Sequence, residues 1–130
     1  MYGSPSAAKK VTVPDLRARK GGEKIAMVTG YDYTMARLLD EAGVDMVLVG
    51  DSAATNVLGY RSTREILVEE LLMLTRAARR GVRNALLVGD LPFSTYEATD
   101  DLAVSTARRF ADAGCDLVKV EGAAEIVSRV

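Results

Sequence analysis

Three acidic residues lie within two positions of the end of an apolar run: Asp51, Asp90 and Glu121. The chain contains no histidine, so a metal bound within it would be held by oxygen ligands, which favours Mg²⁺, Ca²⁺ or Mn²⁺. Each acid taken alone could equally cap the helix or loop that follows it. Because all three follow predicted strands, we favour a metal site formed by Asp51, Asp90 and Glu121 together.

Lys119 is a charged residue inside the otherwise apolar run Leu117–Val120. Side chains alternate along a strand, so Lys119 shares one face with Glu121. A buried lysine is rare unless it is paired or functional. A structural Lys119–Glu121 ion pair is the alternative, but the position near a strand end favours a role in binding or catalysis. Ser52 has no base beside it in sequence, and we interpret it as a hydrogen-bond donor to a substrate carboxylate instead of a nucleophile.

The elements that would hold these residues alternate between strand and helix. Uniformly apolar runs predict strands buried on both faces of a parallel sheet, at residues 25–29, 46–49, 85–88 and 117–120. Apolar residues at helical spacing follow each run and predict helices at 34–42, 67–78, 103–110 and 123–130. Ser62 and Glu65 have the spacing of a capping box, which predicts the start of the second helix.

An internal repeat supports this order of elements. Residues 42–49 (AGVDMVLV) resemble residues 113–120 (AGCDLVKV), two strand–helix units later. A recurring helix–glycine–strand unit is typical of an α/β fold of the (β/α)8 TIM-barrel type. A doubly wound open sheet is the alternative, but no glycine-rich dinucleotide fingerprint follows a predicted strand. The alignment matches Gly50 to Glu121, so Asp51 lies in the loop and strand alternation does not fix its direction.

The composition excludes several classes of function. The 130 residues are 48% hydrophobic and 27% charged, which suits one globular domain. A net charge of −1 gives no reason to expect nucleic acid or an anionic membrane as partner, and no apolar stretch reaches membrane-spanning length. Without histidine, Ser-His and Cys-His catalysis are excluded within the chain. The single cysteine, Cys115, permits no internal disulfide, which suits a cytoplasmic protein.

Residues 1–10 are small and polar with two lysines, and we interpret them as a flexible N-terminal arm. The folded part would then be residues 11–130. Within it, three motifs occur in the order and spacing of one enzyme family: Gly50–Ser52 (GDS), Asp90–Phe93 (DLPF) and Lys119–Gly122 (KVEG). On these motifs the chain resembles ketopantoate hydroxymethyltransferase over about residues 11–130.

The resemblance implies a (β/α)8 barrel of which this chain supplies about the first four βα units. It implies transfer of a hydroxymethyl group from the co-substrate 5,10-methylenetetrahydrofolate to 3-methyl-2-oxobutanoate, a 2-oxo acid. The product is 2-dehydropantoate, a precursor of pantothenate, and the reaction uses Mg²⁺-assisted enolisation. The resemblance also implies a cytoplasmic homo-oligomer, decameric in the family.

Residue roles carry over by position. The resemblance implies that Asp51 and Asp90 are magnesium ligands with Glu121 contributing, and that Asp51, Ser52, Asp90 and Lys119 contact the oxo acid. The family's general base is a glutamate in the second half of the barrel, so we expect no catalytic base in this chain.

Two alternatives to this function stay open. One is a Mg²⁺-dependent C–C lyase or mutase of the isocitrate lyase and phosphoenolpyruvate mutase group, which also acts on 2-oxo acids. The other follows from length, because a complete barrel of this type needs about 250 residues. In that case the chain would be an inactive truncated half barrel.

Overall fold

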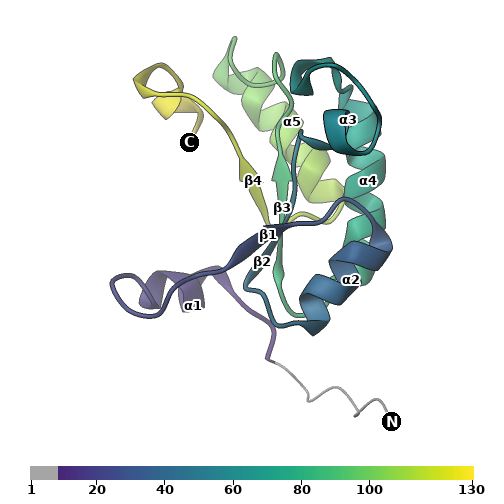
Figure 1. The fold of residues 1–130 in the computed structure, drawn as a ribbon. Coiled ribbons are helices and arrows are strands. Elements are labelled where there is room, and N and C mark those ends of the chain that lie inside the picture. Colours follow the sequence, from purple (N-terminus) through teal and green to yellow (C-terminus); the bar gives the residue numbers. More distant parts are fainter. Residues whose placement is uncertain (1–8) are drawn as a thin grey trace.

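The computed structural model describes residues 9–130, which form one four-stranded parallel sheet with helices packed against it (Figure 1). The strands are β1 (Met27–Thr29), β2 (Met46–Val49), β3 (Leu86–Asp90) and β4 (Leu117–Lys119). They lie side by side in chain order, and every neighbouring pair is parallel. This arrangement confirms the α/β fold predicted from the sequence, that of the first four units of a (β/α)8 barrel.

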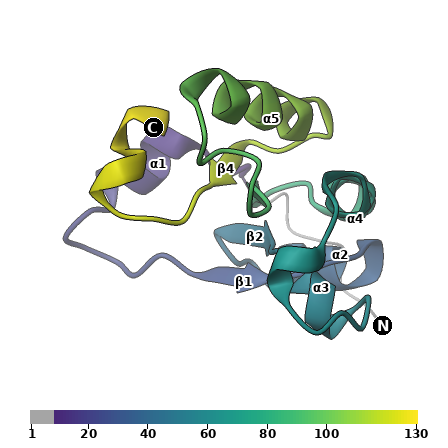
Figure 2. The same cartoon turned by 90° about the horizontal axis from the view of Figure 1, so that it is seen from above.

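Helical segments precede, separate and follow the strands, and those between strands make the long connections that a parallel sheet needs. In chain order they are α1 (Val13–Ala18), α2 (Tyr33–Glu41), α3 (Ala53–Asn56), α4 (Val68–Gly81) and α5 (Asp100–Asp112), with the 3₁₀ turns η1 (Thr63–Glu65) and η2 (Ala124–Arg129). Figures 1 and 2 show α2, α4 and α5 together on one side of the sheet. None of the helices described is long and apolar enough to cross a membrane.

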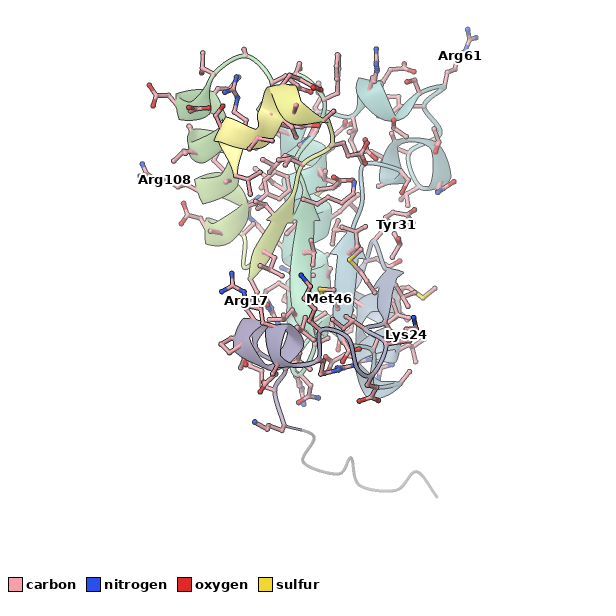
Figure 3. All side chains as sticks on the ribbon, turned by 90° about the vertical axis from the view of Figure 1, so that its left-hand side faces the viewer. Arg17, Lys24, Tyr31, Met46, Arg61 and Arg108 are labelled. Atoms are coloured by element: carbon pink, nitrogen blue, oxygen red, sulfur yellow. The ribbon has the colours of Figure 1, made fainter. Side chains whose placement is uncertain are left out.

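The hydrophobic core lies between the sheet and these three helices. Val47 of β2, Leu87 of β3, Leu71 of α4 and Phe110 of α5 are all completely buried there. Burial of such a side chain contributes about 1.5–3 kcal/mol. Within residues 9–130, the opposite face of the sheet carries no covering helix along most of its length, and Figure 3 looks onto it with Met46 near the middle. On this side Met27 of β1 is 46% exposed.

The internal repeat has a structural reason, which is the aspartate that precedes β2 and β4. Asp45 accepts a hydrogen bond from the Ala26 amide at 2.8 Å, next to β1. Its counterpart Asp116 accepts one from the Leu87 amide of β3 at 2.9 Å. Each carboxylate also accepts from an arginine guanidinium. The repeated aspartate therefore ties each new strand to the strand before it and fixes the register.

The second helix begins within one residue of its predicted start at 67, but not from the predicted capping box at Ser62 and Glu65. Ser62 accepts from the Arg64 amide at 3.2 Å and caps only the turn η1, because Ile66 returns to an extended backbone conformation. Helix α4 begins at Val68, and Glu70 accepts from the Leu67 amide at 2.9 Å. The predicted capping box of Ser62 and Glu65 was therefore wrong as the start of this helix.

Other boundaries also differ from the prediction. The segment 123–130 forms the 3₁₀ turn η2 instead of an α-helix, and the short helix α3 lies in a predicted loop. Helix α1 was not predicted, although Thr12 and Asp15 form a capping box in which the Asp15 amide donates to Thr12 Oγ1 at 3.3 Å. Of the predicted arm, residues 1–8 lie outside the described residues.

Candidate active site

The carboxyl ends of β2, β3 and β4 bring the three predicted acids together. Asp90 ends β3 and pairs in register with Lys119, which ends β4. Glu121 lies two residues beyond that pair, and Asp51 follows β2 after one glycine. One carboxylate oxygen from each of Asp51, Asp90 and Glu121 lies within 4.8 Å of the others. The sheet thus positions three ligand atoms from three neighbouring strands at one point.

Asp90 is the centre of this cluster. Its side chain is 4% exposed, and its two oxygens accept from different partners. Oδ2 accepts from the Asp51 amide at 3.1 Å, and Oδ1 accepts from Lys119 Nζ at 2.9 Å. The first bond turns the loop after β2 toward β3. It places Asp51 at the site, which strand alternation alone did not determine.

Lys119 pairs with two carboxylates, because its ammonium group donates to Glu121 as well as to Asp90. The ion pair considered as the structural alternative is therefore present, but it is part of a larger cluster. Three carboxylates and one ammonium leave two negative charges in excess. Two excess negative charges are what a divalent cation would balance.

The pKa values respond to this crowding. Burial raises the pKa of Asp51, and the negative charges of Asp90 and Glu121 raise it further, with Lys119 opposing. For Lys119, burial acts to lower the pKa, but hydrogen bonds to Glu121 and Asp90 outweigh it and the pKa rises. Lys119 therefore stays charged at neutral pH, and the site holds an excess of negative charge at a cost that a cation would relieve.

The donor set fits a hard divalent cation. All three candidate ligand atoms are carboxylate oxygens, and Mg²⁺ is commonly held by one or two carboxylates with water and substrate oxygens completing its shell. Asp90 is buried, Asp51 is half-buried and Glu121 is exposed, so one side of the cluster stays open to a ligand.

Ser52 lies beside the cluster with its hydroxyl in a short chain of hydrogen bonds. Ser52 Oγ and the Tyr31 hydroxyl are 2.8 Å apart, and Asn56 Nδ2 donates to that hydroxyl at 3.0 Å. Ser52 makes no side-chain cap for α3, so its hydroxyl remains available to a ligand. The sequence did not indicate Tyr31 as the partner of Ser52, because Tyr31 lies 21 residues earlier, in the loop between β1 and α2.

A cavity of about 320 Å³ adjoins the carboxylates. Its lining includes Asp51 and Glu121 on one side and Arg64, Phe93 and Tyr96 on another. The Arg64 guanidinium stacks on the Phe93 ring, 4.3 Å from its centroid. The volume is at the lower end of the range for small-molecule sites, and it combines polar groups near the acids with an aromatic wall.

The strand order and the acidic cluster define a protein of the (β/α)-barrel type with a candidate cation site at the carboxyl ends of its strands. Solved structures share this fold. One is a phosphonopyruvate hydrolase in complex with oxalate and Mg²⁺, at a TM-score of 0.65 and 18% identity, covering 79% of this chain and 36% of that one. Another is 2,3-dimethylmalate lyase, a member of the PEP mutase/isocitrate lyase superfamily, at a TM-score of 0.63 and 16% identity, covering 84% and 38%.

Sequence relatives identify the family. The model of the ketopantoate hydroxymethyltransferase family matches residues 10–130, and this chain belongs to that family. It is 47% identical over 123 residues to the 3-methyl-2-oxobutanoate hydroxymethyltransferase of Ignicoccus hospitalis, covering 94% of this chain and 47% of that protein. It is 50% identical over 124 residues to that of Corynebacterium jeikeium, covering 94% and 44%. The chain thus spans about half the length of these relatives.

Proposed function

We propose that this chain provides the metal and oxo-acid site of a 3-methyl-2-oxobutanoate hydroxymethyltransferase. The reaction moves a hydroxymethyl group from 5,10-methylenetetrahydrofolate to 3-methyl-2-oxobutanoate and gives 2-dehydropantoate, a step of pantothenate biosynthesis. The observation that carries the proposal is the convergence of Asp51, Asp90 and Glu121 around Lys119, in a chain whose curated relatives carry that name.

The roles of the residues follow from their chemistry. Asp51 and Asp90 hold Mg²⁺ with Glu121 contributing, since these carboxylate oxygens converge. When bound, Mg²⁺ supplies positive charge against which the negative charge of an enolising 2-oxo acid is stabilised.

Lys119 holds a proton on Nζ beside the same acids and adds a second positive charge near the oxo-acid oxygens. The Ser52 hydroxyl donates to the substrate carboxylate, in an orientation that Tyr31 restricts. We assign the base that takes the C3 proton to none of these residues.

Two further properties belong to the proposal. We place the protein in the cytoplasm, where a lone cysteine without a disulfide partner is usual. We also propose that it acts as a homo-oligomer. Support comes from β1, an edge strand on which Met27 and Val28 are 46% and 40% exposed, because apolar edge strands favour association.

The test is turnover with Mg²⁺, 3-methyl-2-oxobutanoate and methylenetetrahydrofolate, comparing the protein with Asp51→Ala. Asp101→Ala is the control, since Asp101 is an exposed residue in the first turn of α5. Because none of these residues is assigned as the base, the test also follows Mg²⁺-dependent binding of the oxo acid. We expect Asp51→Ala and chelation of the metal each to abolish that binding and any turnover, and Asp101→Ala to leave both as in the unaltered protein. Turnover that survives both treatments would contradict the proposed site.

The fold alone favours a second candidate, the C–C lyases and mutases, through its similarity to 2,3-dimethylmalate lyase. At 16% identity that similarity concerns the fold only. Cleavage of 2,3-dimethylmalate, measured beside the transferase reaction, separates the two, and we expect none. If neither reaction proceeds but Mg²⁺-dependent binding of the oxo acid remains, the inactive half barrel becomes the better description.

A further inference from the structure

The Tyr96 hydroxyl both donates a hydrogen bond to the backbone of Glu121 and accepts one from it. The phenol donates to the Glu121 carbonyl at 2.8 Å and accepts from the Glu121 amide at 3.0 Å. Tyr96 is 5% exposed and lies in the loop between β3 and α5. One buried side chain therefore satisfies both polar groups of a single backbone position 25 residues away.

These two hydrogen bonds hold the chain just beyond the carboxyl end of β4, where hydrogen bonding to β3 stops. The Leu91 amide donates to the Lys119 carbonyl at 3.0 Å, and strand β4 ends at that residue. Beyond it, the backbone of Glu121 has the Tyr96 hydroxyl as its partner instead of a neighbouring strand. The Tyr96 hydroxyl thus continues the hydrogen bonding of the β4 backbone as far as Glu121, which is the third acid of the cluster.

Glu121 depends on this anchor more than the other acids do. The Asp90 side chain is 4% exposed and is held by burial, whereas the Glu121 side chain is 64% exposed. Apart from its bond to Lys119, what fixes the Glu121 carboxylate is the position of its own backbone.

The loop that carries Tyr96 is itself held from two sides. Thr106 of α5 donates its hydroxyl to the Thr95 carbonyl at 2.7 Å. Arg129 donates to the Tyr96 carbonyl at 3.2 Å and to the Glu97 carbonyl at 3.0 Å. A hydroxyl anchored in this way can impose a position on its partner.

We propose that Tyr96 is a positioning residue, whose hydroxyl holds Glu121 within reach of the cation shared with Asp51 and Asp90. This inference rests on the metal site of the proposed function. It assigns Tyr96 no contact with the reacting atoms, and its effect on the metal passes through Glu121.

The test is Mn²⁺ affinity, measured by electron paramagnetic resonance in the full chain under conditions where circular dichroism shows each variant folded. Tyr96→Phe keeps the buried ring and removes only the hydroxyl. Loss of an outer-shell partner commonly weakens metal binding by about 10–100-fold, and we expect about a tenfold rise in the Kd for Mn²⁺. Tyr33→Phe is the control, because Tyr33 is 47% exposed and its hydroxyl makes no hydrogen bond among the described residues.

A second comparison isolates the route. In a Glu121→Ala background, Tyr96→Phe should change the Kd no further, because the residue it positions is gone. An unchanged Kd in the single variant, with only a lower melting temperature, would overturn the inference and leave the metal site standing. An undiminished effect in the Glu121→Ala background would overturn it too. Failure of the unaltered protein to bind Mn²⁺ would instead overturn the metal site, and this role of Tyr96 with it.

Discussion

Asp90→Asn should separate the proposed metal-binding role of the acidic cluster from its role in stability. The substitution preserves the size of a side chain that is 4% exposed and removes one negative charge. Asp90 loses its ion pair with Lys119, but Lys119 keeps Glu121 as a partner. At the same time the charge repulsion that helps to raise the pKa of Asp51 is relieved.

The two effects on folding oppose each other. Removing one partner of a fully buried ion pair costs about 3–5 kcal/mol. Lys119 is 30% exposed and stays paired, so solvent screening reduces the loss. With the relief of repulsion, we expect the free energy of unfolding to fall by about 1 kcal/mol. For cation binding, nothing offsets the loss of a charged ligand. We therefore expect Mn²⁺ affinity to fall about 100-fold, equal to about 2.7 kcal/mol.

Asp40→Asn is the matched control for this experiment. Asp40 is also a buried aspartate, 6% exposed, but its carboxylate accepts from the Asn84 and Ala85 amides at 2.9 and 2.7 Å at the start of β3. We expect this variant to lose about 1–2 kcal/mol of stability and to keep its Mn²⁺ affinity. Urea unfolding and Mn²⁺ titration of both variants give the comparison. If Asp90→Asn loses about 3–5 kcal/mol with unchanged Mn²⁺ affinity, the cluster is a structural ion-pair network and holds no metal.

Three further predictions follow from local geometry. Gly89→Ala would place a methyl group 2.5 Å from Phe110 Cδ1, and urea unfolding should show a loss of about 1–3 kcal/mol. Asp45→Asn should make the fall in the free energy of unfolding at acid pH less steep, measured by urea unfolding at each pH. A guanidinium hydrogen bond lowers the pKa of Asp45 from 3.8, so its contribution is present above pH 3.8 and is lost as the pH falls through the lower folded-state value. Tyr31→Phe removes a hydrogen bond to Ser52, and calorimetry should show about threefold to tenfold weaker binding of the oxo acid.

Each of these has a result that would contradict it. Unaltered stability in Gly89→Ala would mean that the helix facing β3 moves away freely. A fall at acid pH as steep in Asp45→Asn as in the unaltered protein would assign the acid sensitivity to other carboxylates. Full oxo-acid affinity in Tyr31→Phe would mean that Ser52 needs no partner to orient it.

The strands and the acids that follow them were predictable because each strand is a uniformly apolar run. The expected burial on both faces holds at every position only for β3, whereas β1 is exposed throughout. The predicted strand 46–49 has the bounds of β2, and 117–120 differs from β4 by one residue. Strand alternation predicted that Lys119 and Glu121 share one face, and the two side chains are paired in the structure. That Asp90 lies beside Lys119 follows from the register of β3 and β4, which was not predicted. Their roles in binding stay predictions.

Other parts of the site depended on contacts between residues far apart in sequence. Asp51 is turned by an amide bond to Asp90, 39 residues later, and no local pattern contains that bond. The same holds for Tyr96 and Glu121, 25 residues apart. The wrong helix start at Ser62 had a different cause. Its hydroxyl bonds two residues ahead, to Arg64, and such a bond stabilises a single turn as well as a helix.

We propose that the carboxyl ends of β2, β3 and β4 form a Mg²⁺-dependent site for a 2-oxo acid. The most direct test is calorimetric binding of 3-methyl-2-oxobutanoate to this chain, with and without Mg²⁺, beside Asp51→Ala. We expect binding only when Mg²⁺ is present, and none in Asp51→Ala. Binding that is equal without Mg²⁺, or that survives in Asp51→Ala, would contradict it.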